Sequence, residues 1–211
     1  MTEASALPDT GAAYDAVATL YAELVSDILA GLPLERALIA AFADLVRAHG
    51  GPVGDLGCGP GHLTAHLHTL GLDAFGVDLS AEMIALARRA HPELRFEQGT
   101  MTALDLPAAT LGGILASYSI IHLPPAQLST VFGEFHRVLA PGGHLLLGFF
   151  AGDDPAPQAF DHKVTTAYRW SPDSLADLLR AAGFTEVGRL RREPREGERF
   201  HHAQLLMCKP A

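Results

Sequence analysis

The chain has 211 residues, of which 48% are hydrophobic and only 18% are charged, so it can bury a large core and is not a disordered polymer. Its length favours one large domain over two small ones. The formal net charge of −9 disfavours nucleic acid as a partner, and two cysteines are too few for a disulfide framework.

The N-terminal stretch "MTEASALPDTGAA" has no basic residue and no apolar run, so it does not resemble a signal peptide. Because nothing in residues 1–12 has a periodic apolar face, we expect these residues to form a mobile tail. No apolar run approaches the roughly 20 residues that a membrane helix needs. These features predict a cytoplasmic protein without membrane contact, with residues 13–211 forming a single domain.

Residues 13–50 are expected to form a helical cap on this domain. Apolar residues recur at helical spacing over Ala13–Leu29, and "GLP" then interrupts the pattern. A second helix is predicted over Leu34–His49, because two glycines and a proline follow it.

Residues 51–150 alternate between short apolar runs and helical stretches. Strands are predicted at Val53–Leu56, Ala74–Val77, Leu94–Glu97, Gly113–Ser117 and His144–Phe149. Helices are predicted between them at Gly61–Leu70, Ala81–Ala90 and Pro125–Leu139. Such alternation with nearly continuous apolar strands indicates an α/β fold, a doubly wound and mostly parallel sheet with helices on both faces.

Residues 151–211 complete the domain with a different pattern. The least regular stretch, Ala151–Trp170, follows the carboxyl end of a strand, where open α/β sheets bind ligands. Ser171 and Pro172 are typical of a helix start, and this helix is predicted to end at Gly183. The runs "TEVGRLRR" and "FHHAQLLMCK" then predict a C-terminal antiparallel hairpin.

The stretch "DLGCGPG" places a glycine-rich loop after the first predicted strand. Gly57, Gly59 and Gly61 form GxGxG, whereas a dinucleotide fingerprint is GxGxxG. A carboxylate at Asp55 would repel a pyrophosphate and suits a ligand with positive charge, unless it only orders the loop through hydrogen bonds. Asp78 ends the next strand, where an acid binds the hydroxyls of a ribose. The ligand therefore contains a ribose and need not contain a pyrophosphate, and S-adenosylmethionine meets both conditions.

The motifs "DLGCGPG", "VDLS" and "HRVLAPGGHLLLGFF" together resemble those of class I S-adenosylmethionine-dependent methyltransferases of the small-molecule type. The resemblance covers residues 52–150, and the C-terminal hairpin in outline. It implies a Rossmann-like sheet of seven strands whose last strand is inserted antiparallel. It also implies S-adenosyl-L-methionine as the methyl donor and S-adenosyl-L-homocysteine as the product.

The same resemblance implies a set of cofactor-binding residues. Asp55 would end the strand before the glycine loop, and this loop would wrap the methionine part. Asp78 would bind the ribose, and Leu79 would lie beside the adenine. Where many members have a "GDA"-like stretch, this sequence has "GTM", so Thr100 replaces the acid that would contact the adenine. The remaining residues implied by the family are Gly57, Cys58, Gly59 and Gly61 in the loop, Thr100 and Met101 at the adenine, Ser117 and Tyr118 under the methionine, and Tyr14 or Tyr21 closing over the cofactor.

Methyl transfer needs the nucleophile held in line with an already activated methyl group, so no catalytic side chain is obligatory. His122 is the candidate general base or acceptor-binding group, with a structural role as the alternative. Candidates for lining the acceptor pocket are His162, Tyr168, Trp170, His201 and His202. Because neighbouring side chains in a strand point to opposite faces, His201 and His202 are not expected to share one substrate.

No metal site is expected, since His62 and His66 share a helix face without a third ligand nearby. The predicted function is transfer of a methyl group to an oxygen, nitrogen or carbon atom of a small metabolite or natural-product intermediate, by a monomer or homodimer. The alternatives are a methyltransferase acting on protein or RNA, a nicotinamide-dependent oxidoreductase, and a non-catalytic module that only binds S-adenosylmethionine.

Overall fold

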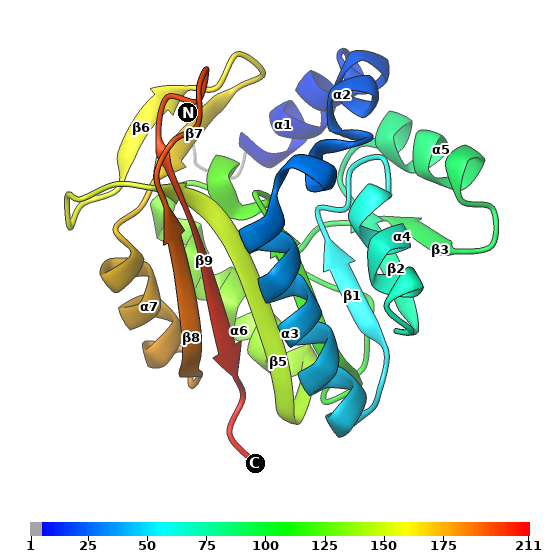
Figure 1. The fold of residues 1–211 in the computed structure, drawn as a ribbon, viewed down its shortest axis with the longest axis vertical. Coiled ribbons are helices and arrows are strands. Elements are labelled where there is room, and N and C mark those ends of the chain that lie inside the picture. Colours follow the sequence, from blue (N-terminus) through cyan, green and yellow to red (C-terminus); the bar gives the residue numbers. More distant parts are fainter. Residues whose placement is uncertain (1–5) are drawn as a thin grey trace.

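A seven-stranded sheet forms the centre of the computed structural model, which describes residues 6–211, with side chains from residue 10 onward (Figure 1). The strand order is β3-β2-β1-β4-β5-β9-β8. Neighbours from β3 to β5 run parallel, whereas β9 is antiparallel to both β5 and β8. The strands are β1 (Val53–Leu56), β2 (Ala74–Asp78), β3 (Arg95–Gln98), β4 (Leu111–Ser117), β5 (Leu139–Ala151), β8 (Thr185–Arg192) and β9 (His201–Cys208). The predicted doubly wound fold, with its last strand inserted antiparallel, is confirmed.

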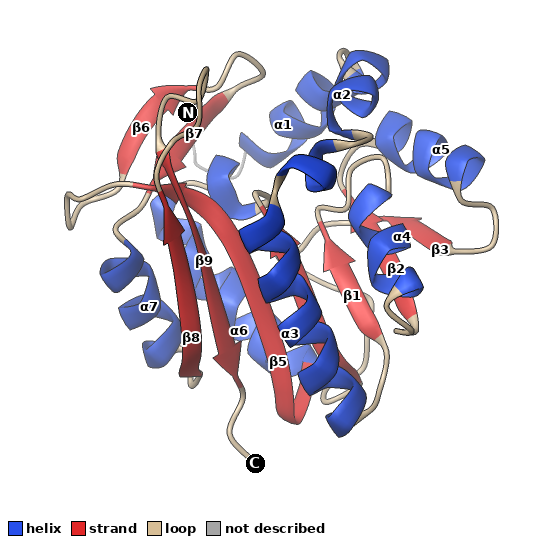
Figure 2. Ribbon diagram, viewed as in Figure 1, coloured by secondary structure: helices blue, strands red, loops and turns tan. Residues whose placement is uncertain are grey.

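Helices cover both faces of the sheet (Figure 2). Adjacent strand residues alternate between two cores: Leu145 and Leu147 pack with α6 and α7, and Leu146 packs with α3 and α4 on the opposite face. This alternation follows from the two-residue period of a strand and buries both faces of the central part of β5, residues 145–149. The helices are α3 (Pro33–His49), α4 (His62–Thr69), α5 (Ala81–Ala90), α6 (Leu128–Val138) and α7 (Pro172–Ala181).

The N-terminal cap differs from its prediction as a single helix over Ala13–Leu29. The chain forms α1 (Ala6–Asp15), α2 (Ala18–Val25) and a short 3-10 turn η2 (Ile28–Gly31). Residues 6–12, expected in the tail, are helical, and residues 1–5 of that tail lie outside the described residues. Both α1 and α2 pack on α5, so tertiary contacts stabilise helices too short to be stable alone.

A second difference lies in the stretch Ala151–Trp170. It contains a separate antiparallel hairpin of β6 (Gln158–Asp161) and β7 (Thr166–Arg169), near the carboxyl end of β5 (Figure 1). Trp170 fixes this hairpin, because its backbone N–H donates to Phe150 O and its carbonyl accepts from the N–H of Gly152. The sequences of β6 and β7, QAFD and TAYR, form no apolar run bounded by turn residues, so this hairpin was not predicted from the sequence.

Within residues 6–211, none of the helices combines the length and the apolar character that a membrane crossing requires.

Candidate active site

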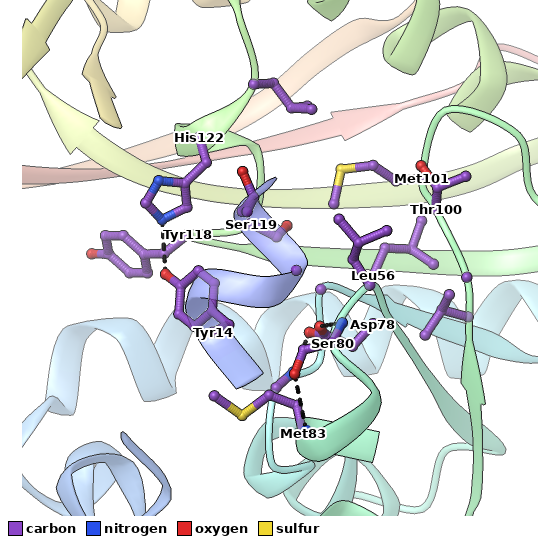
Figure 3. A pocket seen from close by; sticks show the side chains of 18 of the residues that line it. Tyr14, Leu56, Asp78, Ser80, Met83, Thr100, Met101, Tyr118, Ser119 and His122 are labelled. Carbon is purple, nitrogen blue, oxygen red and sulfur yellow. Dashed lines mark hydrogen bonds between the residues drawn. The ribbon is translucent and has the colours of Figure 1, made fainter. Parts of the chain in front are cut away.

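A cavity of about 800 Å³, counting its open mouth, lies where the carboxyl ends of β1, β2 and β4 meet α1 (Figure 3). This is the edge at which open α/β sheets bind ligands. The cavity is lined by these residues named from the sequence: Tyr14, Tyr21, Gly57, Gly59, Asp78, Leu79, Thr100, Met101, Ser117, Tyr118 and His122.

The glycine loop brings backbone against this cavity. Gly57 has a φ of +79°, and a Cβ there would lie 2.2 Å from Cβ of Ser119. Gly59 has a φ of +53°, and its N–H donates a hydrogen bond of 2.8 Å to Oδ2 of Asp78. Gly61 has another role: it precedes α4, and a Cβ there would contact the ring of Phe96 at 2.8 Å. The first two glycines open the ligand side of the loop, and the third permits helix packing.

Asp55 and Cys58 do not line the cavity that the described residues form. Asp55 is 1% exposed and accepts a hydrogen bond of 2.6 Å from the Thr64 hydroxyl, which ties β1 to α4. Burial raises the pKa of Asp55 to about 7, against the lowering effect of Thr64. Cys58 is also buried, close to Gly76, which agrees with a space-filling role. Direct contact of these two residues and Gly61 with the cofactor stays a prediction.

Asp78 presents its carboxylate to the cavity at the end of β2. Besides Gly59, the N–H of Ser80 donates to this carboxylate at 2.9 Å. Burial raises the pKa of Asp78, and these two hydrogen bonds oppose that rise. Ser80 in turn caps α5 by accepting from the N–H of Met83 at 3.1 Å. Ser80 and Met83 also line the cavity and had no signal in the sequence beyond their place after Asp78.

At the predicted adenine side, Thr100 and Met101 lie opposite Asp78 across the cavity (Figure 3). The Thr100 hydroxyl forms a hydrogen bond of 2.8 Å with the Thr102 hydroxyl. Thr100, which stands where the resemblance implies an acid, therefore offers only a hydroxyl that already has a protein partner.

Two tyrosines close the cavity, Tyr14 from α1 and Tyr21 from α2. The rings of Tyr14 and Tyr21 meet edge to face at 5.6 Å. The Tyr14 hydroxyl lies 2.8 Å from Nε2 of His122, which belongs to the 3-10 turn η3 (Ile120–His122) (Figure 3). Nδ1 of His122 faces the carbonyl of Thr166 at 2.9 Å, so Nδ1 carries the proton and Nε2 accepts from Tyr14. Burial lowers the pKa of His122 to about 4, which keeps the ring neutral at pH 7.

Two residues after β4 combine unusual features. Tyr118 has a φ of +53°, a left-handed conformation that is rare outside glycine, and its hydroxyl is hydrogen-bonded to Nδ1 of His202. Oγ of Ser119 is buried at the cavity and has no hydrogen-bond partner among the described residues. Because buried hydroxyls are normally satisfied, this one fits a site built to receive a polar ligand.

The acceptor-side candidates separate into two groups. His162 lies against His122, with ring centroids 5.0 Å apart, and His202 lies against Tyr118, at 5.5 Å. His201 instead contacts Glu193 at 2.8 Å on the exposed side, so the two neighbouring histidines do point apart. Trp170 is 4% exposed within the core, and Tyr168 packs on that core. Their role toward an acceptor stays a prediction.

The comparisons with known proteins agree with this geometry. The family described as "Methyltransferase domain" matches residues 53–143. The demethylmenaquinone methyltransferase of Beutenbergia cavernae is 29% identical over 85% of this chain and 84% of that protein. The malonyl-[acyl-carrier protein] O-methyltransferase of Erwinia billingiae is 30% identical over 65% of this chain and half of that protein.

A solved structure is similar over nearly the whole chain. It is the 1,6-didemethyltoxoflavin-N1-methyltransferase of Burkholderia thailandensis, with bound 1,6-didemethyltoxoflavin and S-adenosylhomocysteine. The two chains are 28% identical, the match covers 94% of this chain and 90% of that one, and the TM-score is 0.67.

The fold and the cavity define a Rossmann-like methyltransferase. The methyltransferase domain that matches residues 53–143 and the solved relative with bound S-adenosylhomocysteine indicate an S-adenosylmethionine-dependent methyltransferase that is similar to the class I enzymes. These similarities favour methyl transfer over nicotinamide-dependent oxidoreduction.

Proposed function

We propose that this enzyme methylates an oxygen, nitrogen or carbon atom of a small, planar ring compound, with S-adenosylmethionine as donor. The observation that supports a planar acceptor is an aromatic cluster beside the end of the cavity at which His122 lies. Neighbouring ring centroids within it lie 4.8–6.2 Å apart. The aromatic cluster consists of Tyr118, Phe150, Phe160, His162, Phe200 and His202.

The chemistry of the aromatic cluster suits a flat acceptor. Its rings are half-buried, come from the ends of β4, β5 and β6 and from the C-terminal hairpin, and pack against one another beside the cavity, which Tyr118 lines. Planar rings gain from offset or edge-to-face contacts with such side chains. Guanidinium groups of Arg169 and Arg199 lie 4.3 and 4.9 Å from the Phe200 ring centroid. Their positive charge favours an acceptor with carbonyl oxygens or an anionic group.

Buried polar atoms without partners mark both ends of the proposed site. Ser119 Oγ lies on the donor side, and Nδ1 of His162 lies on the acceptor side, with no hydrogen-bond partner among the described residues. The names of the Beutenbergia and Burkholderia relatives specify small-molecule acceptors, which supports the same class here.

The donor residues follow from the geometry of the cavity. Asp78 would hold the ribose hydroxyls, and the backbone of Gly57 and Gly59 would cradle the methionine part. Thr100 and Met101 would contact the adenine. When bound, S-adenosylmethionine supplies a methyl group activated by its sulfonium, so the main task of the protein is to position the acceptor and exclude water.

We assign His122 to closure of the cavity, because its Nε2 already accepts the Tyr14 hydroxyl. Its Nδ1 donates to the backbone carbonyl of Thr166, and a carbonyl stabilises an imidazolium less than a carboxylate does. His122 therefore holds Tyr14 in place and borders the acceptor through His162.

The donor assignment is tested by calorimetry with S-adenosylhomocysteine. Asp78→Ala is expected to weaken binding about 100-fold, because two or three charge-assisted hydrogen bonds are lost. Asp73→Ala, an exposed carboxylate five residues earlier, is the matched control and is expected to bind like the wild type. Equal affinity of the Asp78 variant and the wild type would contradict the donor site.

The acceptor class is tested by transfer of a radiolabelled methyl group to two panels of compounds. The planar panel holds a hydroxynaphthalene, a hydroxyquinoline and an aminopyrimidine, and the aliphatic panel holds succinate and ethanolamine. Transfer to the planar panel alone is expected. Transfer restricted to the aliphatic panel, or no transfer by an enzyme that binds S-adenosylhomocysteine, would refute a planar acceptor.

A further inference from the structure

Two tyrosine–histidine pairs border the cavity, and they differ in the group that contacts the second ring nitrogen of the histidine. In the Tyr14–His122 pair, this group is the backbone carbonyl of Thr166. In the Tyr118–His202 pair, the tyrosine hydroxyl contacts Nδ1 of His202, and Nε2 of His202 faces the carboxylate of Glu198 at 3.6 Å. Only the second pair has a negative charge placed to stabilise a protonated imidazole.

Glu198 is held in position by two arginines from the hairpin connection. Arg192 donates to both oxygens of its carboxylate, at 2.5 and 2.9 Å, and Arg195 donates through its backbone N–H and its side chain. These contacts lower the pKa of Glu198 to about 2, so the carboxylate is ionised at neutral pH. Such bidentate contacts fix its orientation toward His202.

The support for Glu198 extends into the N-terminal helices. Arg192 also pairs with Glu35 of α3, and the side chains of Arg192 and Glu35 are only 9% and 6% exposed. A buried ion pair contributes little net stability, so its effect is mainly to hold a geometry. The arrangement fixes Glu198, and through it His202, at one end of the aromatic cluster.

The backbone at Tyr118 places its ring between the cavity and His202. Tyr118 lines the cavity, and its N–H donates to the carbonyl of Gly148 at 2.8 Å, which fixes its left-handed conformation. Figure 3 shows the ring beside the Tyr14–His122 pair, at the end of the cavity away from Asp78. Backbone strain of this kind is concentrated at functional sites.

We propose that Tyr118, His202 and Glu198 form a proton relay that removes the proton of the acceptor during methyl transfer. This proposal rests on the proposed function. As the acceptor atom bonds to the methyl carbon and the carbon–sulfur bond breaks, the acceptor proton moves to the Tyr118 oxygen. The hydroxyl proton of Tyr118 moves to Nδ1 of His202, and the resulting imidazolium replaces the sulfonium as the positive charge. Tyr118 is the catalytic residue in this step, and His202 and Glu198 are positioning residues.

The charges around His202 allow it to accept a proton only transiently. The pKa of His202 is lowered to about 4, mainly by burial; Arg192 and Arg195 act in the same direction, and Glu198 and Glu35 oppose them. His202 is therefore neutral before the reaction, with Nδ1 free to accept from Tyr118 and the Nε2 proton directed to Glu198.

The test uses Tyr118→Phe, His202→Gln and Glu198→Gln, with Glu196→Gln as the matched control. Glu196 is an exposed carboxylate two residues from Glu198 in the same hairpin connection and lies outside the relay. Single-turnover rates are measured from about pH 6 to about pH 10 with the planar acceptor that turns over fastest. Calorimetry with S-adenosylhomocysteine and thermal melting show whether each variant still folds and binds the donor product.

Near neutral pH, each relay variant is expected to transfer the methyl group about 100-fold more slowly than the wild type, the usual loss when general-base assistance is removed. This loss is expected to shrink as the pH passes the pKa of the acceptor, because an acceptor that has ionised needs no base. The affinity for S-adenosylhomocysteine is expected to stay within about twofold. The rate of Glu198→Asp is expected to lie between those of the wild type and Glu198→Gln, and Glu196→Gln is expected to react like the wild type.

A loss of the same size at every pH, or unchanged rates in Glu198→Gln and His202→Gln, would overturn the relay while leaving the proposed function intact. Failure of the wild type to bind S-adenosylhomocysteine would instead overturn the proposed function, and the relay with it.

Discussion

Replacement of Gly57 by alanine tests how the glycine loop is built. A non-glycine residue at a φ of +79° costs about 1–2 kcal/mol, because its Cβ crowds the next carbonyl. The new Cβ would also lie 2.2 Å from Cβ of Ser119, and relieving such an overlap costs about 1–3 kcal/mol. The free energy of unfolding of Gly57→Ala is therefore expected to fall by about 2–5 kcal/mol.

The control is Gly133→Ala, in the interior of α6, where an added Cβ meets nothing within 4 Å. This substitution is expected to raise the free energy of unfolding by about 0.5–1 kcal/mol. Urea unfolding at constant pH measures both changes, and in a chain of this size 1 kcal/mol corresponds to about 2–4 °C in Tm. A Gly57→Ala protein as stable as the wild type would refute the assigned loop geometry.

Two further predictions concern the ionisable groups around the cavity. The raised pKa of Asp55, about 7 when folded, means that the folded protein loses stability as the pH rises from about 4 to about 7. Asp55→Asn is therefore expected to gain stability relative to the wild type over that range in pH-dependent urea melts, and a constant difference would contradict the assigned burial. Tyr14→Phe removes the hydrogen bond to His122 and is expected to weaken S-adenosylhomocysteine binding about threefold to tenfold by calorimetry. Unchanged affinity would show that this contact does not hold α1 over the cavity.

The boundaries of a helix or strand could be predicted where they depend on the residues of that element and its immediate neighbours in the sequence. Ala81–Ala90 has the predicted boundaries because Ser80 caps it from the neighbouring position, and Val53–Leu56 has them because it is apolar between two turns. The boundary between α1 and α2 depends instead on packing against α5, from another part of the chain. No pattern within residues 13–29 contains that information.

The donor side of the site was predictable for the same reason. Gly57, Gly59 and Asp78 follow strand ends, and parallel strands bring their carboxyl ends together. The direction of the Asp55 side chain, away from the cavity and toward Thr64, depends on how α4 packs, so its hydrogen bond with Thr64 was not foreseen.

The acceptor side was less predictable because its contacts are long-range. Tyr14 meets His122 across 108 residues of sequence, and Tyr118 meets His202 across 84. Spacing along the chain contains no information on such pairs, and the aromatic cluster likewise joins residues from separate elements.

The end of α1 joins the two halves of the cavity. The carboxylate of Asp15 accepts from the Ser80 hydroxyl at 2.5 Å and from the N–H of Glu82 at 3.0 Å, on the side of Asp78. The preceding residue, Tyr14, contacts His122 on the side of the acceptor. Because these neighbours cannot move independently, we expect the donor and acceptor ends to open together. Occupation of either end would then favour the closed helix and raise the affinity of the other, a reciprocal coupling that arises from two consecutive residues.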